Sequence, residues 1–212
     1  MSARYFATVR GEILPFLPAK VARLLDLGCG TGATVGFVRE ARAVEWAGGI
    51  ELDSQSAEVA RRVCDRVWTG DATSLPFEKE IAGASLDLVL CLDMLEHLAD
   101  PWAMVRRLSP LLKPGGRLIL SVPNIRNWKF LWRLAAQGDF RYRDAGLLDR
   151  THLRFFVRET AIELATSGGL RLVGAANAHP FAFPDARFLL SRASFGRLEE
   201  LLAKQWLVIA ER

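Results

Sequence analysis

The sequence has few cysteines and histidines and no long apolar run, and these absences exclude several classes of protein. Its three cysteines, Cys29, Cys64 and Cys91, are odd in number and far apart. They fit neither a disulfide framework nor a zinc site and are typical of a reducing compartment. No apolar run approaches the roughly 18–20 residues of a membrane span, and the first residues lack the apolar core of a signal peptide. We therefore expect a cytoplasmic protein without a membrane span.

The composition is typical of one globular domain with a large core. Half of the 212 residues are hydrophobic, and the chain has no internal repeat. The formal net charge is +4, but it is unevenly distributed. Residues 124–158 contain eight Lys or Arg and three Asp, a net charge of +5, so the remaining residues together carry −1. The basic character therefore belongs to a single segment.

Apolar runs and helical patterns alternate along the chain, which predicts a doubly wound α/β sheet with right-handed crossovers. The predicted strands cover residues 21–27, 44–52, 66–69, 86–92, 117–122, 170–175 and 205–210. The predicted helices cover residues 5–14, 32–41, 54–63, 100–112, 158–167 and part of 185–203. Ser54 is the predicted N-cap of the third helix, and Asp100 with Pro101 predicts the start of the fourth. Ligands of such sheets bind at the carboxyl ends of the strands.

The first predicted strand leads into a glycine-rich turn, DLGCGTG at residues 26–32. Glycine adopts positive φ and has no Cβ, so the turn can be sharp and a ligand can lie against bare backbone. The helix that follows would point its unpaired N–H groups toward that ligand. Alone, this loop predicts a nucleotide-like cofactor without naming it.

Two further strand ends carry acids that suit a nucleoside. Glu51 lies 23 positions after Gly28, where an acid that binds two ribose hydroxyls is expected. Asp71 lies in the small-residue turn Gly70-Asp71-Ala72 and can accept a hydrogen bond from an exocyclic adenine amine. The fourth predicted strand leads into CLDMLEH at residues 91–97. A nucleoside-containing cofactor is therefore expected across these strand ends.

These motifs, in this order, resemble those of the class I S-adenosylmethionine-dependent methyltransferases. Residues 26–32 resemble their first motif, Glu51 their ribose acid, residues 70–72 their adenine turn, and LKPGG at 112–116 the turn before their fifth strand. The resemblance covers roughly residues 21–124. It implies a Rossmann-like, seven-stranded, mostly parallel sheet with an antiparallel last strand, and S-adenosylmethionine as the cofactor. Residues 205–210 would supply the antiparallel strand.

The resemblance also implies the cofactor contacts. Backbone N–H groups near Gly28 and Gly30 would approach the methionine end, and Asp26 would interact with its ammonium. Leu52 and Leu92 would enclose the adenine ring between apolar side chains. The full set of predicted cofactor-binding residues is Asp26, Gly28, Cys29, Gly30, Glu51, Leu52, Asp71, Ala72, Cys91 and Leu92.

A nicotinamide cofactor is the competing interpretation. The loop satisfies the permissive G-x-G-x-x-G/A dinucleotide pattern from Gly28 to Ala33, and Glu51 fits the ribose acid of that pattern too. However, Asp26 ahead of the glycines is unusual there, and the turn at residues 70–72 would have no role. The sequence therefore favours S-adenosylmethionine over an NAD-dependent oxidoreductase.

His97 is the first of two candidate catalytic residues. Its stretch, residues 91–97, is similar to the corresponding one in the ubiquinone-biosynthesis O-methyltransferases, which implies a position beside the sulfonium. Three interpretations stay open: His97 is a general base, it binds a divalent cation together with Asp93 and Glu96, or it orients the loop together with Glu96. We assign no metal ligand.

His152 is the second candidate catalytic residue. It lies in LDRTHLRFF at residues 148–156, a stretch that resembles methyltransferases found in bacterial surface-polysaccharide loci. His152 would line the acceptor pocket, or it would be a structural histidine with its hydrogen bonds satisfied.

Residues 124–158 are the predicted acceptor lid, because this family builds its lid after the fifth strand. The segment combines basic residues with Trp128, Phe130, Trp132, Phe140, Tyr142, Phe155 and Phe156. It would recognise an anionic acceptor, or its aromatics would be core and its arginines a solvated face. The predicted organisation is one domain: 1–20 leading helix and linker, 21–123 cofactor-binding core, 124–158 lid, and 159–212 C-terminal helices and last strands.

The sequence thus predicts O-methylation of a small-molecule or sugar-containing acceptor, with the oligomeric state left open. An RNA methyltransferase is the alternative, since basic and aromatic residues together suit RNA. The N-P-P-[FYW] signature of base-amine methyltransferases is missing from the fourth strand end, so nucleic acid is the less favoured partner. Contact of residues 128–134 with a membrane surface and a non-catalytic cofactor-binding role also stay open.

Overall fold

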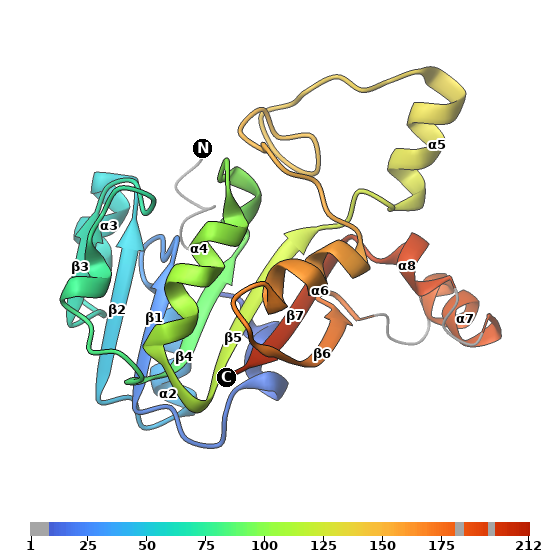
Figure 1. The fold of residues 1–212 in the computed structure, drawn as a ribbon. Coiled ribbons are helices and arrows are strands. Elements are labelled where there is room, and N and C mark those ends of the chain that lie inside the picture. The colour runs from blue at the N-terminus through green and yellow to red at the C-terminus, as the bar shows by residue number, and fades with distance from the viewer. Residues whose placement is uncertain (1–8, 181–184, 195–197) are drawn as a thin grey trace.

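The computed structural model describes residues 9–180, 185–194 and 198–212, and its centre is one seven-stranded sheet (Figure 1). The order of the strands across the sheet is β3-β2-β1-β4-β5-β7-β6. The strands are β1 (Arg23–Leu27), β2 (Trp46–Glu51), β3 (Arg66–Thr69), β4 (Leu86–Leu92), β5 (Leu112–Pro123), β6 (Arg171–Asn177) and β7 (Gln205–Glu211).

The pairing of the strands confirms the predicted mostly parallel sheet. β1 pairs in parallel with both β2 and β4, β2 with β3, and β4 with β5. β7 runs antiparallel to its two neighbours, β5 and β6. Because the strand order reverses between β1 and β4, the carboxyl ends of these two strands form the edge at which doubly wound sheets bind ligands.

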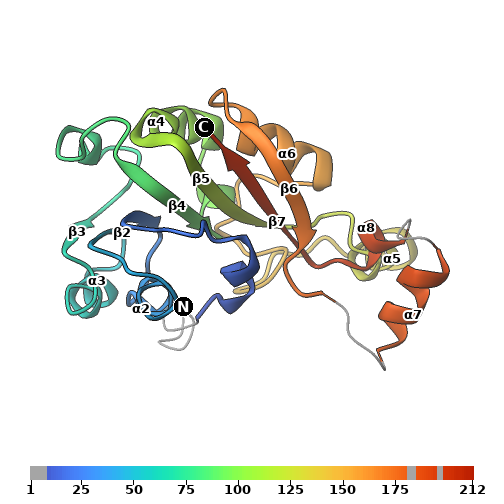
Figure 2. The same ribbon diagram turned by 90° about the horizontal axis from the view of Figure 1, so that it is seen from below.

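Helices cover both faces of the sheet (Figure 2). On one face lie α2 (Ala33–Ala41), α3 (Ser54–Ala60) and the 3₁₀ helix η1 (Gly11–Phe16). On the other lie α4 (Pro101–Leu108) and α6 (Arg158–Thr166). Val35 and Val38 of α2 pack into the first layer of the core, and Met104 and Leu108 of α4 pack into the second. This apolar packing on both faces explains why the central strands read as continuous hydrophobic runs.

Helix caps fix where the helices begin. Asp100 accepts a hydrogen bond from Ala103 N at 2.9 Å and is followed by Pro101, as predicted for the start of α4. The predicted cap of α3 is wrong by one residue. Asp53, not Ser54, is the N-cap, because its carboxylate accepts from Ser56 N at 2.8 Å. α4 ends at Leu108, earlier than predicted, and the 3₁₀ helix η4 (Ser109–Leu111) follows it.

The structure also differs from the predicted bounds in two further segments, the leading helix and the start of β5. The predicted leading helix over 5–14 lies partly outside the described residues, and the described part forms η1, which contains Pro15. β5 begins at Leu112 and not at residue 117, so the predicted turn at 113–116 is part of the strand. Its pairing with β4 is irregular there, with a register shift between Leu86 and Leu88. The short 3₁₀ helices η2 (Phe77–Lys79) and η3 (Leu95–His97) flank β4.

The segment predicted as a lid projects from the body of the molecule as α5 (Trp128–Gln137), followed by a long loop that returns to α6 (Figure 1). Its base is fastened to the C-terminal part, which contains α7 (Ala186–Ala193) and α8 (Glu199–Leu202). Asn124 and Asn127 both donate hydrogen bonds to the carbonyl of Ala203. Within the described ranges, the structure contains no helix with the length and apolar character needed to cross a membrane.

Candidate active site

A cavity of about 1110 Å³ opens at the carboxyl ends of β1, β2 and β4. Nine of the ten predicted cofactor-binding residues line it: Asp26, Gly28, Cys29, Gly30, Glu51, Leu52, Asp71, Ala72 and Leu92. They come from four separate segments that the parallel strand order brings to one edge. The structure therefore brings the predicted set together in one place.

Cys91 is the exception and corrects the prediction. It lies on β4 immediately before Leu92, but it is completely buried in the core layer under α4 and α6 and does not line the cavity. Successive residues of a strand point to opposite faces of the sheet. The side chain of Cys91 therefore packs in the core, and we no longer include Cys91 among the proposed cofactor-binding residues.

The glycine loop contributes bare backbone, but not the free N–H groups that the sequence suggested. Gly28 and Cys29 both donate to the carbonyl of Ile50, at 2.8 and 3.1 Å. Gly30 donates to Glu51 Oε2 at 2.8 Å. Gly28, Gly30 and Gly32 all have positive φ, which glycine adopts without strain. These N–H groups of the loop thus donate to residues of β2. Because they are not available to an anion, the loop suits a ligand without a phosphate.

Glu51 and Asp71 line the cavity and differ in how many hydrogen bonds their carboxylates already accept. Glu51 is almost fully buried, and its Oε1 accepts from Asp53 N at 2.9 Å. Asp71 accepts from the backbone N and the hydroxyl of Thr73, both on Oδ1 at 2.8 Å. The backbone bond from Thr73 is the main cause that lowers the pKa of Asp71. Asp71 is therefore ionised, and its Oδ2 accepts no hydrogen bond from the described residues.

Asp26 is the most perturbed acid of the cavity. Burial is the main cause that raises the pKa of Asp26 to about 8, and the neighbouring Glu51 raises it further. Arg10, from the segment before η1, acts in the opposite direction. A carboxyl with this pKa is largely protonated at neutral pH, and a cation bound beside it would favour its ionised form. The position therefore suits a ligand ammonium.

A second cavity, of about 620 Å³, lies against the first. The two have three lining residues in common: Asp93, His179 and Gln205. The lining of the second cavity includes cationic residues from two distant segments, Lys129, Arg133, Arg143 and Lys204. Sequence reasoning had not singled out Arg10, His179, Lys204 or Gln205, because they belong to segments far from the motifs.

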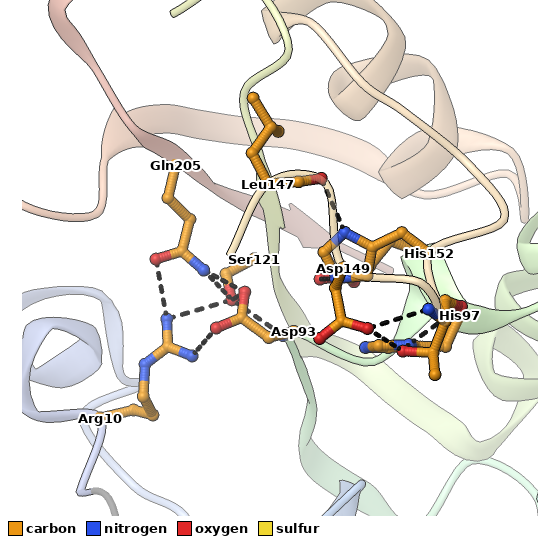
Figure 3. A network of polar contacts seen from close by, with 10 residues as sticks. Arg10, Asp93, His97, Ser121, Leu147, Asp149, His152 and Gln205 are labelled. Carbon is orange, nitrogen blue, oxygen red and sulfur yellow. Dashed lines mark hydrogen bonds and ion pairs between the residues drawn. The ribbon is translucent and has the colours of Figure 1, made fainter. Parts of the chain in front are cut away.

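A polar network forms the wall between the cavities (Figure 3). Arg10 forms an ion pair with Asp93 and donates to Ser121 Oγ at 3.2 Å and to Gln205 Oε1 at 3.3 Å. Ser121 donates to Asp93 Oδ1 at 3.1 Å. Asp93 has a φ of 55°, a left-handed backbone conformation that only a few non-glycine residues adopt. The network thus holds a strained strand end at the junction of the two cavities.

The two candidate histidines lie together on one side of this network (Figure 3), and each lines a different cavity. His97 lines the larger cavity and His152 the smaller, and their ring centroids are 4.7 Å apart. His97 Nδ1 lies 3.0 Å from the hydroxyl of Thr151, which itself donates to Asp149, and 3.3 Å from the carbonyl of Thr151. His152 Nδ1 donates to the carbonyl of Leu147 at 3.0 Å. A carbonyl can only accept, so both rings keep Nε2 as their open nitrogen. Burial and the neighbouring His152 lower the pKa of His97.

The structure changes the set of residues that could hold a metal ion. In the described part of the chain, Glu96, His97 and His152 form such a group, with one ligand atom from each lying within 4.8 Å of the others. The sequence had suggested Asp93, Glu96 and His97. Asp93 is instead held by Arg10, Ser121 and Gln205, and His152 takes its place in the group.

Most arginines of the lid are bound within it. Asp139 pairs with Arg133, Arg141 and Arg143, and Arg150 pairs with Asp144. Among the aromatics, Phe130 is buried against Phe140, with ring centroids 5.7 Å apart. Trp128 and Trp132 are exposed. Some aromatic residues of this segment are therefore core and others are exposed. Because most of its arginines pair with acids of the same segment, fewer cations are available to an acceptor than the sequence suggested.

Fold and site together define an α/β protein with a Rossmann-like sheet and a cavity at the carboxyl edge of that sheet. The family described as Methyltransferase domain matches residues 1–174, so the chain belongs to that family. It is a class I methyltransferase whose cofactor is S-adenosylmethionine, and this finding replaces the nicotinamide alternative.

The comparisons include one curated relative and two solved structures of particular interest. The chain is 31% identical over 166 residues to a ubiquinone biosynthesis O-methyltransferase of Xanthomonas axonopodis pv. citri, a match covering 70% of this chain and 66% of the relative. A SAM-dependent methyltransferase from Archaeoglobus fulgidus superposes with a TM-score of 0.67 at 17% identity, covering 100% and 95% of the two chains. A Haloferax volcanii complex of the Trm112 methyltransferase activator with a methyltransferase superposes with 0.66 at 16% identity, covering 99% and 92%. The structural likenesses show the fold alone.

Proposed function

We propose that this enzyme methylates an oxygen of a small-molecule or sugar-containing acceptor that carries an anionic group and lies in the smaller cavity. The observation that carries the proposal is the pair of cavities that meet at Asp93, His179 and Gln205. One cavity has acids suited to a nucleoside and an ammonium, and the other has cations in its lining. A methyl donor and an anionic acceptor can therefore meet at the shared wall.

The residues of the larger cavity fit the groups of S-adenosylmethionine. Glu51 retains lone pairs for the ribose hydroxyls, since each carboxylate oxygen accepts only one protein N–H. Asp71 Oδ2 suits the exocyclic adenine amine. Leu52 is 73% exposed at the cavity, which suits an apolar cover over a purine ring. Asp26 suits the ammonium, because a bound cation would favour the ionised carboxylate and lower the pKa of Asp26 from its raised value.

The chemistry needs alignment and the removal of one proton. When bound, the cofactor supplies an activated methyl group on a positively charged sulfur. Holding the acceptor oxygen in line with that methyl group can supply roughly 7–11 kcal/mol of the barrier reduction. His152 on the acceptor side and His97 on the cofactor side are the proposed groups to orient the hydroxyl and take its proton through Nε2. Oxygen is the favoured acceptor atom because the curated relative is named an O-methyltransferase.

The anionic character of the acceptor rests on lining cations with donor capacity that the described residues do not use. Lys129 and Lys204 line the smaller cavity, and neither has an ion-pair partner among the described residues. Arg133 lines it too, and its buried Nε has no hydrogen-bond partner. Phosphate and carboxylate are the groups that such donors bind most strongly. A phosphorylated, nucleotide-linked or carboxylated acceptor therefore fits the cavity.

Two measurements test the proposal in sequence. Calorimetry should show binding of S-adenosylmethionine and of its demethylated product, and no binding of NADH. Radiolabelled methyl transfer should then be measured against nucleotide sugars, phenolic acids, quinol precursors and tRNA. We expect label on an anionic small molecule. Label on tRNA would instead support the RNA alternative, and cofactor binding without transfer to any class would support a non-catalytic subunit.

A further inference from the structure

One short stretch of the lid, residues 149–154, contributes side chains to both cavities, and we call it the strap. Thr151 and Leu153 line the larger cavity, whereas Asp149 and His152 line the smaller one. From Thr151 to Leu153, consecutive residues thus border different cavities. A ligand that holds the strap from the larger cavity therefore acts on the same backbone that carries His152.

Hydrogen bonds dock the strap on η3 and on the residues that follow it. Leu153 N at 2.8 Å and Arg154 N at 3.0 Å both donate to the carbonyl of Glu96. Arg154 Nε donates to the carbonyl of Ala99 at 3.0 Å. Both carbonyls lie beyond the end of β4, at the carboxyl edge of the sheet. These bonds set the path of the strap beside the two cavities.

The strap also contains hydrogen bonds of its own. Asp149 Oδ1 accepts from Thr151 N at 2.9 Å and from the hydroxyl of Thr151 at 2.6 Å. The carbonyl of Asp149 accepts from His152 N at 3.1 Å. These bonds join residues that border the larger cavity to residues that border the smaller one. A constraint on Leu153 is therefore passed to His152, its neighbour along the chain.

The strap has little apolar packing to hold it in place. Arg150, Thr151, Leu153 and Arg154 are all exposed. A segment with exposed hydrogen bonds and few buried apolar contacts opens locally at a low cost in free energy. A ligand that adds an apolar contact to such a segment reduces its freedom, and a second ligand that needs the ordered segment then binds more tightly.

Leu153 is the side chain through which a ligand of the larger cavity can make that contact. It is 53% exposed, although its backbone N–H is bonded to Glu96. Single exposed leucines are common on protein surfaces, but Leu153 lines the same cavity as Leu52, which is 73% exposed. Two uncovered apolar side chains in one cavity offer apolar area that a bound ligand can bury.

We propose that S-adenosylmethionine covers Leu153 and thereby holds the strap, so that cofactor binding prepares the smaller cavity for the acceptor. This inference rests on the proposed function and deepens it, because it assigns an order of binding in which the cofactor precedes the acceptor. Leu153 is a cofactor contact, and toward the acceptor it is a positioning residue that acts through His152. The coupling is reciprocal, so the acceptor raises the affinity for the cofactor by the same factor.

The first test measures cofactor affinity by calorimetry and needs no acceptor. Leu153→Ala should raise the Kd of S-adenosylmethionine roughly tenfold, because the covered apolar area is lost. Leu153→Met, which keeps nearly the same volume, should restore the Kd to within about threefold of the wild type. Leu189 of α7 provides the matched control, since it is also 53% exposed and lines neither cavity. Leu189→Ala should change the Kd by less than about twofold.

The second test determines whether the bound cofactor holds the strap. Hydrogen exchange is measured at the amides of Leu153 and Arg154, which donate to Glu96, with and without saturating demethylated cofactor. We expect exchange at these two amides to slow by at least about tenfold in the wild type, and by much less in Leu153→Ala. The amide of Gly115, which donates to the carbonyl of Arg212 at 2.9 Å, is the control and should keep its rate.

Enzyme kinetics adds a readout of the coupling itself. With an acceptor found by the transfer assay, Leu153→Ala at saturating cofactor should raise the KM of the acceptor about fivefold or more and leave kcat within about twofold. Leu153→Met should restore the KM. Product-inhibition patterns should show that the cofactor binds before the acceptor.

Two results would overturn the inference. One is a Leu153→Ala protein that binds S-adenosylmethionine as tightly as Leu189→Ala does. The other is an unchanged exchange rate at the Leu153 and Arg154 amides when the wild-type protein is saturated. Failure of the transfer assay for every acceptor would count against the proposed function, while the affinity and exchange measurements would still decide the role of Leu153.

Discussion

Asp26 links the binding of a cation to the ionisation of a buried carboxyl. Its pKa rises from an ordinary 3.8 to about 8, mainly because of burial. Between these values the folded protein holds a proton that the unfolded chain has released. The stability of the cofactor-free protein should therefore fall as pH rises through this window. A ligand ammonium removes the penalty by pairing with the ionised carboxylate.

We predict that the affinity for S-adenosylmethionine rises by up to about tenfold per pH unit between pH 5 and 7, because binding must release the Asp26 proton below a pKa of about 8. Calorimetry in two buffers with different heats of ionisation should count about one proton released. Asp26→Asn should bind more weakly and release none. A wild-type affinity that stays flat over this range would contradict the ammonium assignment.

Glu51 combines a structural and a ligand-binding task in one side chain. Its Oε2 accepts from Gly30 N and its Oε1 from Asp53 N, so the carboxylate fixes the glycine loop and the start of α3 together. Glu51 also lines the larger cavity, which we propose binds the cofactor.

We predict that Glu51→Gln raises the Kd for S-adenosylmethionine by about 10–100-fold, since hydrogen bonds to a charged group contribute roughly 1.5–3 kcal/mol each. Exposed Glu45, at the start of β2, provides the control Glu45→Gln, which should change the Kd less than twofold. Equal effects of the two substitutions, measured by calorimetry, would place the ribose elsewhere.

At the scale of the elements, most of the sheet could be predicted because turn-forming residues lie at both ends of the apolar runs. β3 and β4 begin and end at the predicted residues, 66–69 and 86–92, since turn residues bound each apolar run. Nine of the ten predicted cofactor-binding residues line one cavity at the predicted carboxyl edge of the sheet. Cys91 could not be separated from Leu92, because a strand packed on both faces shows no alternation of polarity.

What the sequence could not predict depends on tertiary contacts. The N–H groups of the glycine loop turn to Ile50 and Glu51 on β2, a pairing that no local pattern encodes. Lys204 and His179 reach the cavities from segments beyond the lid. The lid arginines looked available because their partner Asp139 lies within the same basic run.

The two helix caps near β2 and β4 offer a matched pair of tests. Asp100 caps α4 and lines neither cavity, whereas Asp53 caps α3 and also lines the larger cavity. We predict that Asp100→Ala and Asp53→Ala each cost about 1 kcal/mol of stability and lower the Tm by about 2–4 °C. Only Asp53→Ala should weaken cofactor binding. A weaker cofactor complex in Asp100→Ala, measured by calorimetry beside thermal unfolding, would show that the effect is global.

At the scale of the whole molecule, the smaller cavity is lined by residues that lie far apart in the sequence. Lys129 comes from α5, Lys204 from the approach to β7, and Asp93 from the end of β4. Asn124 and Asn127 bind the carbonyl of Ala203, which fastens the lid beside the residue that precedes Lys204. The position of the cations toward the shared wall therefore depends on the docking of the lid against the C-terminal segment.

This assembly predicts that the charge of the acceptor is recognised by Lys129 and Lys204, which form no ion pair with the described residues, and not by the lid as a whole. Lys129→Glu combined with Lys204→Glu should raise the KM for an anionic acceptor by at least about tenfold at low salt, because each lysine provides a charge-assisted contact worth roughly 1.5–3 kcal/mol. The difference should shrink as ionic strength rises, and the Kd of S-adenosylmethionine should not change. Arg150→Glu, at an exposed side chain paired with Asp144, is the matched control with an expected change below twofold. If the double variant and the control behave alike in steady-state kinetics, the acceptor's anion lies outside the smaller cavity.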